Sequence, residues 1–316
     1  MSQPVFFVVV TLFLASFAPL AAAGYFRWVR LSRPAIGVFD IGDVFAMMGF
    51  VVVLPFVYLA LPGWALPTVL GLVFAAGLGI GYEPVVTHGW WRRGLILSLL
   101  GVDLAAWAAW RAGAAPTWFT AVNSVVVMLI AVSAANLSAQ GGLKLRHAAW
   151  FTLGLAVYDL TFATAIPITQ KLAEAIQGYP YAPSAGLRVG ELSAVIGMGD
   201  LLAYALYGAT AYKAYGRTGL RASVAIVAVF GALLPTLSPL AIEAITGRQP
   251  SLIPAQVFFG PAAFVGYLVL RRLGAERRMV DVLGNRPFSS RPHVASGHGG
   301  PIRSFGSRLE DPKRPR

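Results

Sequence analysis

Hydrophobic residues run along this chain in nine segments, each about as long as the hydrocarbon core of a bilayer is thick. Polar and charged residues gather between the segments, and several segments begin or end at Trp or Tyr, as aromatic belts do. The segments are Val5–Ala23, Val44–Leu61, Trp64–Tyr82, Gly94–Trp110, Trp118–Ala135, Ala148–Ile168, Val189–Tyr212, Ala222–Ile245 and Leu252–Leu270. No run alternates apolar and polar positions as a transmembrane barrel strand would. The pattern predicts an all-α polytopic membrane protein with nine transmembrane helices.

Composition favours the same class, because 57% of the 316 residues are hydrophobic and only 12% are charged. A soluble domain of this size would have about a quarter charged residues. The formal net charge is +12, but 11 of the 25 Lys and Arg residues lie in Arg271–Arg316 and most others flank apolar segments. No nucleic-acid partner is therefore expected. The chain has no cysteine, which excludes disulfides and thiolate metal sites.

The charges beside the segments predict the orientation of the chain. The stretch "PLAAAG" after the first segment resembles a signal-peptide cleavage site, but Arg27, Arg30 and Arg33 follow the segment and no Lys or Arg precedes it. We therefore expect an uncleaved first helix. With an outer N-terminus, the inner loops carry ten Lys and Arg residues and the outer loops four. The positive-inside rule then predicts an N-out, C-in, multi-pass protein of the cell (plasma) membrane.

The chain divides into a transmembrane domain, residues 1–272, and a tail, residues 273–316. The tail is rich in Gly, Pro, Ser and Arg, and it cannot bury enough apolar surface to fold alone. It is expected to be a disordered, basic cytoplasmic segment. Its alternative role is adhesion to anionic lipid headgroups. Neither a repeat nor a second folded domain is indicated, and the oligomeric state cannot be inferred.

Three carboxylates lie well inside predicted spans, at Asp103, Asp159 and Asp200. An ionisable residue in a membrane helix is costly and usually functional. Asp159 lies 11 residues, and Asp200 12 residues, from the predicted cytoplasmic ends of two consecutive spans. Both are therefore roughly 17–18 Å deep. Two adjacent antiparallel helices are thus predicted to bring these two carboxylates to one level.

Such a pair has a defined chemistry. Two carboxylates close together in a low dielectric cannot both ionise, so they share one proton. The ionised member takes a proton from water while the protonated member polarises a carbonyl group, which hydrolyses a peptide without metal or covalent intermediate. The pair titrates as a unit, so neither aspartate is assigned the base role. Gly197 and Gly199 either admit a peptide to the pair or serve helix packing alone.

These residues resemble the motifs of the intramembrane aspartyl proteases, the presenilins and signal peptide peptidases. That family has a Tyr-Asp on its sixth helix, a Gly-x-Gly-Asp on its seventh and a Pro-Ala-Leu at its ninth. The matching residues here are Tyr158, Asp159, Gly197, Met198, Gly199, Asp200, Pro254, Ala255 and Gln256. Gln256 replaces the motif leucine. The N-out orientation is similar to that of signal peptide peptidase, and the short chain resembles a prokaryotic, archaeal-like member.

The resemblance implies cleavage of transmembrane helices or signal peptides inside the bilayer. It implies a presenilin-like bundle in which the helices at about 148–168, 189–212 and 252–270 form the site. Asp159 and Asp200 would be catalytic, and the other motif residues would shape the site or bind substrate. In relatives the substrate adds a β-strand to segments that correspond here to "ITQKLAEAIQGYPYAPSAGLRVG" and the region around Pro254. No cofactor and no metal is expected.

Two other functions remain open. Asp103, Asp159 and Asp200 could form a proton relay in an ion- or proton-coupled transporter, although the inverted repeats typical of transporters are not evident. Asp103 would otherwise be a buried acid bonded to a neighbouring helix. The chain could also be a non-enzymatic relative that binds membrane helices without cutting them. The four histidines are scattered, without metal-ligand spacing, and neither a serine elbow nor a P-loop is present.

Overall fold

The computed structural model describes residues 3–29, 40–164, 168–176, 178–246 and 254–277. Its elements follow one another along the chain as eleven α-helices, one π-helix and two strands in these ranges. They are α1 (Gln3–Trp28), α2 (Ile41–Ala60), α3 (Ala65–Gly81), α4 (Gly89–Arg111), α5 (Pro116–Gln140), α6 (Leu145–Thr164), α7 (Ile168–Ile176), β1 (Ser184–Val189), β2 (Leu192–Gly197), α8 (Met198–Tyr215), α9 (Arg217–Ile226), η1 (Val227–Leu233), α10 (Leu234–Thr246) and α11 (Gln256–Arg271).

Within the described part of the chain, five helical stretches are long and apolar enough to cross a membrane. They are α1, α2, α4, α5 and the continuous run Arg217–Glu243 through α9, η1 and α10. The helices α3 and α11 are apolar but shorter. These helices indicate a membrane-embedded, mainly helical protein, as the sequence predicts. The number of spans, nine, and the orientation stay predictions.

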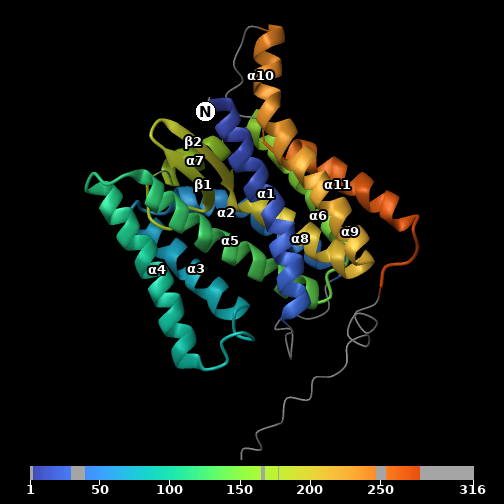
Figure 1. Cartoon of the computed structure of the whole chain (residues 1–316), viewed down its shortest axis with the longest axis horizontal. Helices are drawn as coiled ribbons and strands as arrows, with labels where there is room; N and C mark the ends of the chain where they lie inside the picture. The colour runs from blue at the N-terminus through green and yellow to red at the C-terminus, as the bar shows by residue number, and fades with distance from the viewer. Residues whose placement is uncertain (1–2, 30–39, 165–167, 177, 247–253, 278–316) are drawn as a thin grey trace, which may run out of the picture.

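The helices that carry Asp159 and Asp200 belong to neither apolar group. Most side chains of α8 are buried, and Tyr204 and Tyr207 are fully covered. A helix surrounded by protein needs no lipid-facing surface, so its mean hydropathy can be lower. The helices α1, α5, α9 and α6 all contact α8. Figure 1 shows α1 crossing the molecule beside α8 and α5, which places α8 inside the bundle.

The predicted continuous span Val189–Tyr212 is wrong over its first part, where a short hairpin interrupts an otherwise helical chain. Residues 184–197 form an antiparallel hairpin of β1 and β2, and α8 begins only at Met198. The two-residue connection between the strands has Gly190 at φ 58°, a conformation that glycine adopts without steric cost. Tight hairpin turns favour such a residue. In Figure 1 the hairpin and α7 lie at the same end of the bundle as the start of α1 and the tip of α10.

Of the last two predicted spans, one follows a continuous helical run and the other starts later in the structure than predicted. The predicted span Ala222–Ile245 coincides with α9, η1 and α10, and the π-helical turns of η1 widen the middle of this run. The predicted span Leu252–Leu270 begins later, because α11 starts at Gln256. The predicted disordered tail from residue 278 onward lies outside the described residues.

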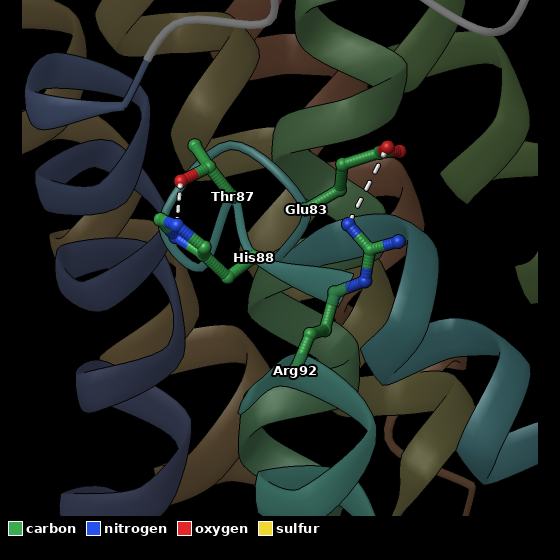
Figure 2. A network of polar contacts seen from close by, with 4 residues as sticks. All are labelled: Glu83, Thr87, His88 and Arg92. Atoms are coloured by element: carbon green, nitrogen blue, oxygen red, sulfur yellow. Dashed lines mark hydrogen bonds and ion pairs between the residues drawn. The ribbon is translucent and has the colours of Figure 1, made fainter. Parts of the chain in front are cut away.

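The connection between α3 and α4 carries the exposed polar network drawn in Figure 2. Arg92 Nη1 lies 3.4 Å from Glu83 Oε1, and Thr87 Oγ1 lies 3.5 Å from His88 Nδ1. The Glu83 side chain is 65% exposed. An ion pair in water contributes about 0–1 kcal/mol, so this network does little to hold the fold. Trp90 and Trp91 beside it are 80% and 70% exposed, as aromatic residues at a membrane surface are.

Candidate functional site

Asp200 lies at the junction between a strand and a helix. The strand β2 ends at Gly197, which is also the N-cap of α8, and Asp200 is in the first turn of that helix. The partial positive charge of a helix N-terminus stabilises a carboxylate in this position. Its side chain is half-buried. The sequence placed Asp200 inside a continuous span, whereas the structure places it where the span gives way to a hairpin.

Asp159 approaches Asp200 from the neighbouring helix α6. The helices α6 and α8 pack together, and the two carboxyl groups lie within electrostatic range of each other and of the buried Tyr204, whose hydroxyl group donates to the Gly231 oxygen. Tyr204 is one turn beyond Asp200 on the same face of α8, and it is fully buried. The structure therefore brings together the two aspartates that the sequence selected by depth. Like charges in a poorly solvated site favour sharing of one proton.

Gln256 joins the third motif to Asp200. Its Nε2 atom donates a hydrogen bond of 2.8 Å to Asp200 Oδ1, and the side chain is only 3% exposed. Gln256 is the first residue of α11, and its Oε1 atom is buried without a hydrogen-bond partner. Pro254 and Ala255 immediately precede it and are half-buried. The main-chain oxygens of both accept hydrogen bonds from the first turn of α11, so these two residues start the helix that presents Gln256 to Asp200.

The glycines before Asp200 leave open space on one side of it. A methyl group added at Gly199 would meet nothing within 4 Å, and one added at Gly197 would lie 3.5 Å from Asp200 Oδ2. Both glycines are exposed, and neither has a positive φ. Space, not backbone conformation, is therefore what these glycines supply. Met198 between them donates its main-chain N–H to the Pro183 oxygen at 2.9 Å and closes the base of the hairpin.

Polar side chains of α5 occupy the outer edge of β1. Ser124 Oγ accepts a hydrogen bond from Gly186 N and donates one to Gly186 O, both at 2.7 Å. Thr120 Oγ1 accepts from Arg188 N, at 3.2 Å. In a strand, alternate residues direct their main-chain groups to opposite edges. Gly186 and Arg188 therefore face α5, and the residues between them bond to β2. The edge of β1 is thus filled by α5.

The opposite edge of the hairpin, on β2, has no strand paired to it in the described part of the chain, although α1 packs beside β2. Register pairs Gly186 with Val195 and Arg188 with Ser193, so the main-chain groups of Val195 and Ser193 also point outward. No hydrogen bond to either from outside the hairpin occurs within the described residues. Val195 is 50% exposed. An unpaired strand edge is a template for a further strand, and this one leads directly to Asp200.

The remaining predicted residues lie apart from this arrangement. The ring of Tyr158 packs against Phe162 with centroids 4.5 Å apart, next to Asp159 on α6. Asp103 is fully buried on α4, where its Oδ2 accepts a hydrogen bond from Tyr181 N at 3.2 Å. In the described part of the chain Asp103 forms no hydrogen bond with Asp159 or Asp200. The structure therefore groups Asp159, Asp200 and Gln256, and it joins Asp103 to the main chain of Tyr181 instead.

Two sets of site residues were not found from the sequence. Tyr204 could have been found by its spacing, because it follows Asp200 by four residues and so lies on the same face of α8. The α5 side chains that hold β1 recur at helical spacing in an otherwise apolar span, which is the pattern of a polar face turned toward protein. They are Thr117, Thr120, Asn123 and Ser124. No cluster of three or more His, Asp or Glu residues that could hold a metal ion occurs among the residues described.

Comparison of the chain with protein-family models, with curated proteins and with solved structures finds no match. Any statement about function therefore depends on the motifs and the geometry of this site.

Proposed function

We propose that this chain is an intramembrane aspartyl protease, an endopeptidase that hydrolyses peptide bonds within transmembrane helices or signal peptides. The observation that carries the proposal is the packing of α6 against α8, which brings the Asp159 and Asp200 carboxyl groups within electrostatic range of each other. Gln256 supports it, because the third motif reaches Asp200 through a direct hydrogen bond. Motif residues that lie far apart in sequence thus converge on one pair of acids.

The reaction uses the shared proton of the pair. The ionised carboxylate takes a proton from a water molecule, and the water oxygen attacks the peptide carbonyl carbon. The protonated carboxyl group gives its proton to the carbonyl oxygen, so that a neutral gem-diol forms. When the C–N bond breaks, the aspartate that took the proton from water gives it to the leaving nitrogen, and one gem-diol hydroxyl gives its proton to the other aspartate as it becomes the carbonyl of the new carboxylic acid, which restores the singly protonated pair. No cofactor takes part in these steps.

The unpaired edge of β2 supplies a docking site for the substrate backbone. A peptide bond inside a helix is shielded by neighbouring turns, so the substrate has to unwind before it can be cut. Main-chain hydrogen bonds to Ser193 and Val195 would stabilise the unwound segment as an added strand. The strand direction then leads the segment past Gly197 and Gly199 to the aspartates, where the structure is open. Backbone pairing of this kind tolerates many substrate sequences.

The proposal includes the setting of the reaction. The enzyme would be an N-out, C-in protein of the cell membrane with nine spans. Its substrates would be membrane-inserted helices, and the basic tail would contact anionic lipid.

Purified full-length protein should cleave a transmembrane peptide in detergent or in bilayers. Asp159→Asn and Asp200→Asn each remove the ability to share a proton, so each should lower the rate below detection. Mass spectrometry of the products identifies the cleaved bond. Asp103→Asn is the matched control, because it makes the same chemical change at a buried aspartate outside the pair.

Full cleavage by either Asn variant would rule out the two-aspartate mechanism. Solute or proton flux in proteoliposomes that depends on Asp103 as well as on the pair, without proteolysis, would instead establish the transporter alternative.

A further inference from the structure

Gln256 provides a hydrogen-bond donor where the resembling family has a leucine. A leucine side chain could only pack against the aspartate, whereas the Gln256 amide donates to Asp200 Oδ1 at 2.8 Å. Because the amide is buried, this hydrogen bond has little competition from water. The described residues provide no comparable donor to Asp159. The two carboxyl groups of the pair are therefore not equivalent.

The donor favours one protonation state of the pair. A hydrogen bond from an N–H group stabilises a carboxylate more strongly than a neutral carboxylic acid. The N-terminal turn of α8 acts in the same direction, because its free N–H groups favour negative charge on Asp200. Asp159 lies toward the opposite, C-terminal end of α6, where the helix dipole offers a carboxylate no such help. The groups that face Asp200 are Asp159 from α6, Tyr204 from α8 and Gln256 from α11.

We propose that Gln256 is a positioning residue that keeps Asp200 ionised and leaves the shared proton on Asp159. Asp200 is then the base that takes the proton from water, and Asp159 is the acid that polarises the substrate carbonyl. This assignment of roles rests on the proposed protease function, but the location of the proton does not. The sequence alone could not tell which aspartate is the base and which the acid, because each of the two motifs supplies one chemically identical carboxyl group.

The Oε1 atom of Gln256 can accept a hydrogen bond from Asp200 after Asp200 has become protonated. It is buried and has no hydrogen-bond partner while Nε2 faces Asp200. Rotation of the terminal amide by half a turn exchanges the two atoms. Once Asp200 has taken the proton from water, its new O–H group can donate to Oε1. One amide thus stabilises Asp200 before and after the proton transfer, which a leucine or a charged residue could not do.

Infrared titration of the carboxyl groups tests, without any cleavage, whether Gln256 stabilises the ionised form of Asp200. In the Asp159→Asn background, the Asp200 band is identified by its absence from the Asp159→Asn/Asp200→Asn protein. Adding Gln256→Met should move the pH at which the Asp200 carboxylate band appears upward by about one unit or more, because a charge-stabilising donor is lost. An unmoved band in a protein that keeps its thermal transition would overturn the proposal.

Steady-state cleavage tests the catalytic role. Gln256→Met should lower kcat about tenfold with KM within about twofold, and should move the acid limb of the kcat–pH profile to higher pH. Gln256→Glu keeps nearly the same shape but replaces the amide donor with a carboxylate. The variant should therefore be inactive near neutral pH. It should recover in part at lower pH, where the introduced carboxyl group is protonated and can donate to Asp200. A pH profile unchanged in shape in both variants would assign Gln256 a merely structural role and overturn the inference.

The two experiments separate the two proposals. A shifted infrared band with no cleavage by the wild-type protein would refute the protease function alone. Cleavage by the wild type with an unmoved band would refute the role of Gln256 alone.

Discussion

Tyr181 lies in the loop before the hairpin, and its main-chain N–H group donates a hydrogen bond to the buried Asp103. Tyr181 adopts φ 59°, the one positive φ of a non-glycine residue within the described ranges. Such a conformation costs about 1–2 kcal/mol, which surrounding contacts have to offset. Asp103 accepts the Tyr181 N–H, and the Tyr181 hydroxyl donates to Leu100 O at 3.3 Å. Asp103 therefore anchors the loop that enters β1.

Two replacements of Asp103 should distinguish the effect of its hydrogen bond to Tyr181 from the effect of its charge. Asp103→Asn keeps an oxygen that can accept from Tyr181 N, so stability and cleavage should remain close to wild type. Asp103→Leu leaves the N–H buried without a partner, which costs about 1–3 kcal/mol. Thermal unfolding in detergent and the cleavage rate measure both effects. A loss of cleavage in the Asn variant equal to that in the Leu variant would mean that the charge of Asp103 is itself required.

The β1–β2 hairpin is the element that connects substrate binding to the acids. One edge is held by the polar face of α5, and the other edge, which carries the exposed Val195, has no strand paired to it in the described residues. An isolated two-stranded hairpin is marginal in water, so the side-chain hydrogen bonds from Ser124 and its neighbours on α5 replace a third strand. Among the residues described, the edge left for pairing is then that of β2, which ends three residues before Asp200.

Val195→Pro should test whether this edge binds substrate. The Val195 N–H points away from β1, so proline removes an outward donor without breaking the hairpin ladder. Substrate cleavage should fall by about tenfold or more, mainly through KM, since one or more intermolecular hydrogen bonds are lost. Val195→Ala, which keeps the N–H, is the control and should retain most activity. Equal rates for the Pro and Ala variants would show that the substrate does not pair with β2.

The whole molecule holds the site through close contacts between helices. A methyl group at Gly260 would overlap the Thr152 carbonyl oxygen, so α11 lies directly against α6. A methyl group at Gly231 would lie 2.9 Å from the Tyr204 ring, whose hydroxyl donates to the Gly231 oxygen at 2.8 Å. Phe259 also packs on Tyr204, with ring centroids 4.8 Å apart. These contacts fix α6, α8 and α11 relative to one another, and with them the two aspartates and the glutamine of the site.

Gly260→Ala should therefore disturb the site from a distance. The added methyl group has to push α11 away from α6, at a cost of about 1–3 kcal/mol. Both the thermal transition and the cleavage rate should fall. Gly101→Ala is the matched control on α4, where an added methyl group meets nothing within 4 Å and should change neither quantity. A Gly260→Ala protein as stable and active as the control would show that the α6–α11 contact does not position the site.

The sequence by itself determined the parts of this protein that depend on local pattern. Bilayer-length apolar runs predict helices because main-chain polar groups inside a membrane have to be satisfied within the segment. The helices α1, α2, α4 and α5 follow those runs closely. Equal depth on consecutive helices was enough to select Asp159 and Asp200, since depth depends only on helix length and rise.

The tertiary structure decided what depends on partners far away in the chain. The apolar stretch before Asp200 is typical of a helix, but it forms β2 because β1 pairs with it and α5 covers the remaining edge of β1. Gln256 reaches Asp200 across 56 residues, and Asp103 holds Tyr181 across 78. Such contacts follow from how closely helices pack, which a one-dimensional pattern does not encode. The contact of Gln256 with Asp200 also gives the two aspartates different hydrogen-bonding surroundings.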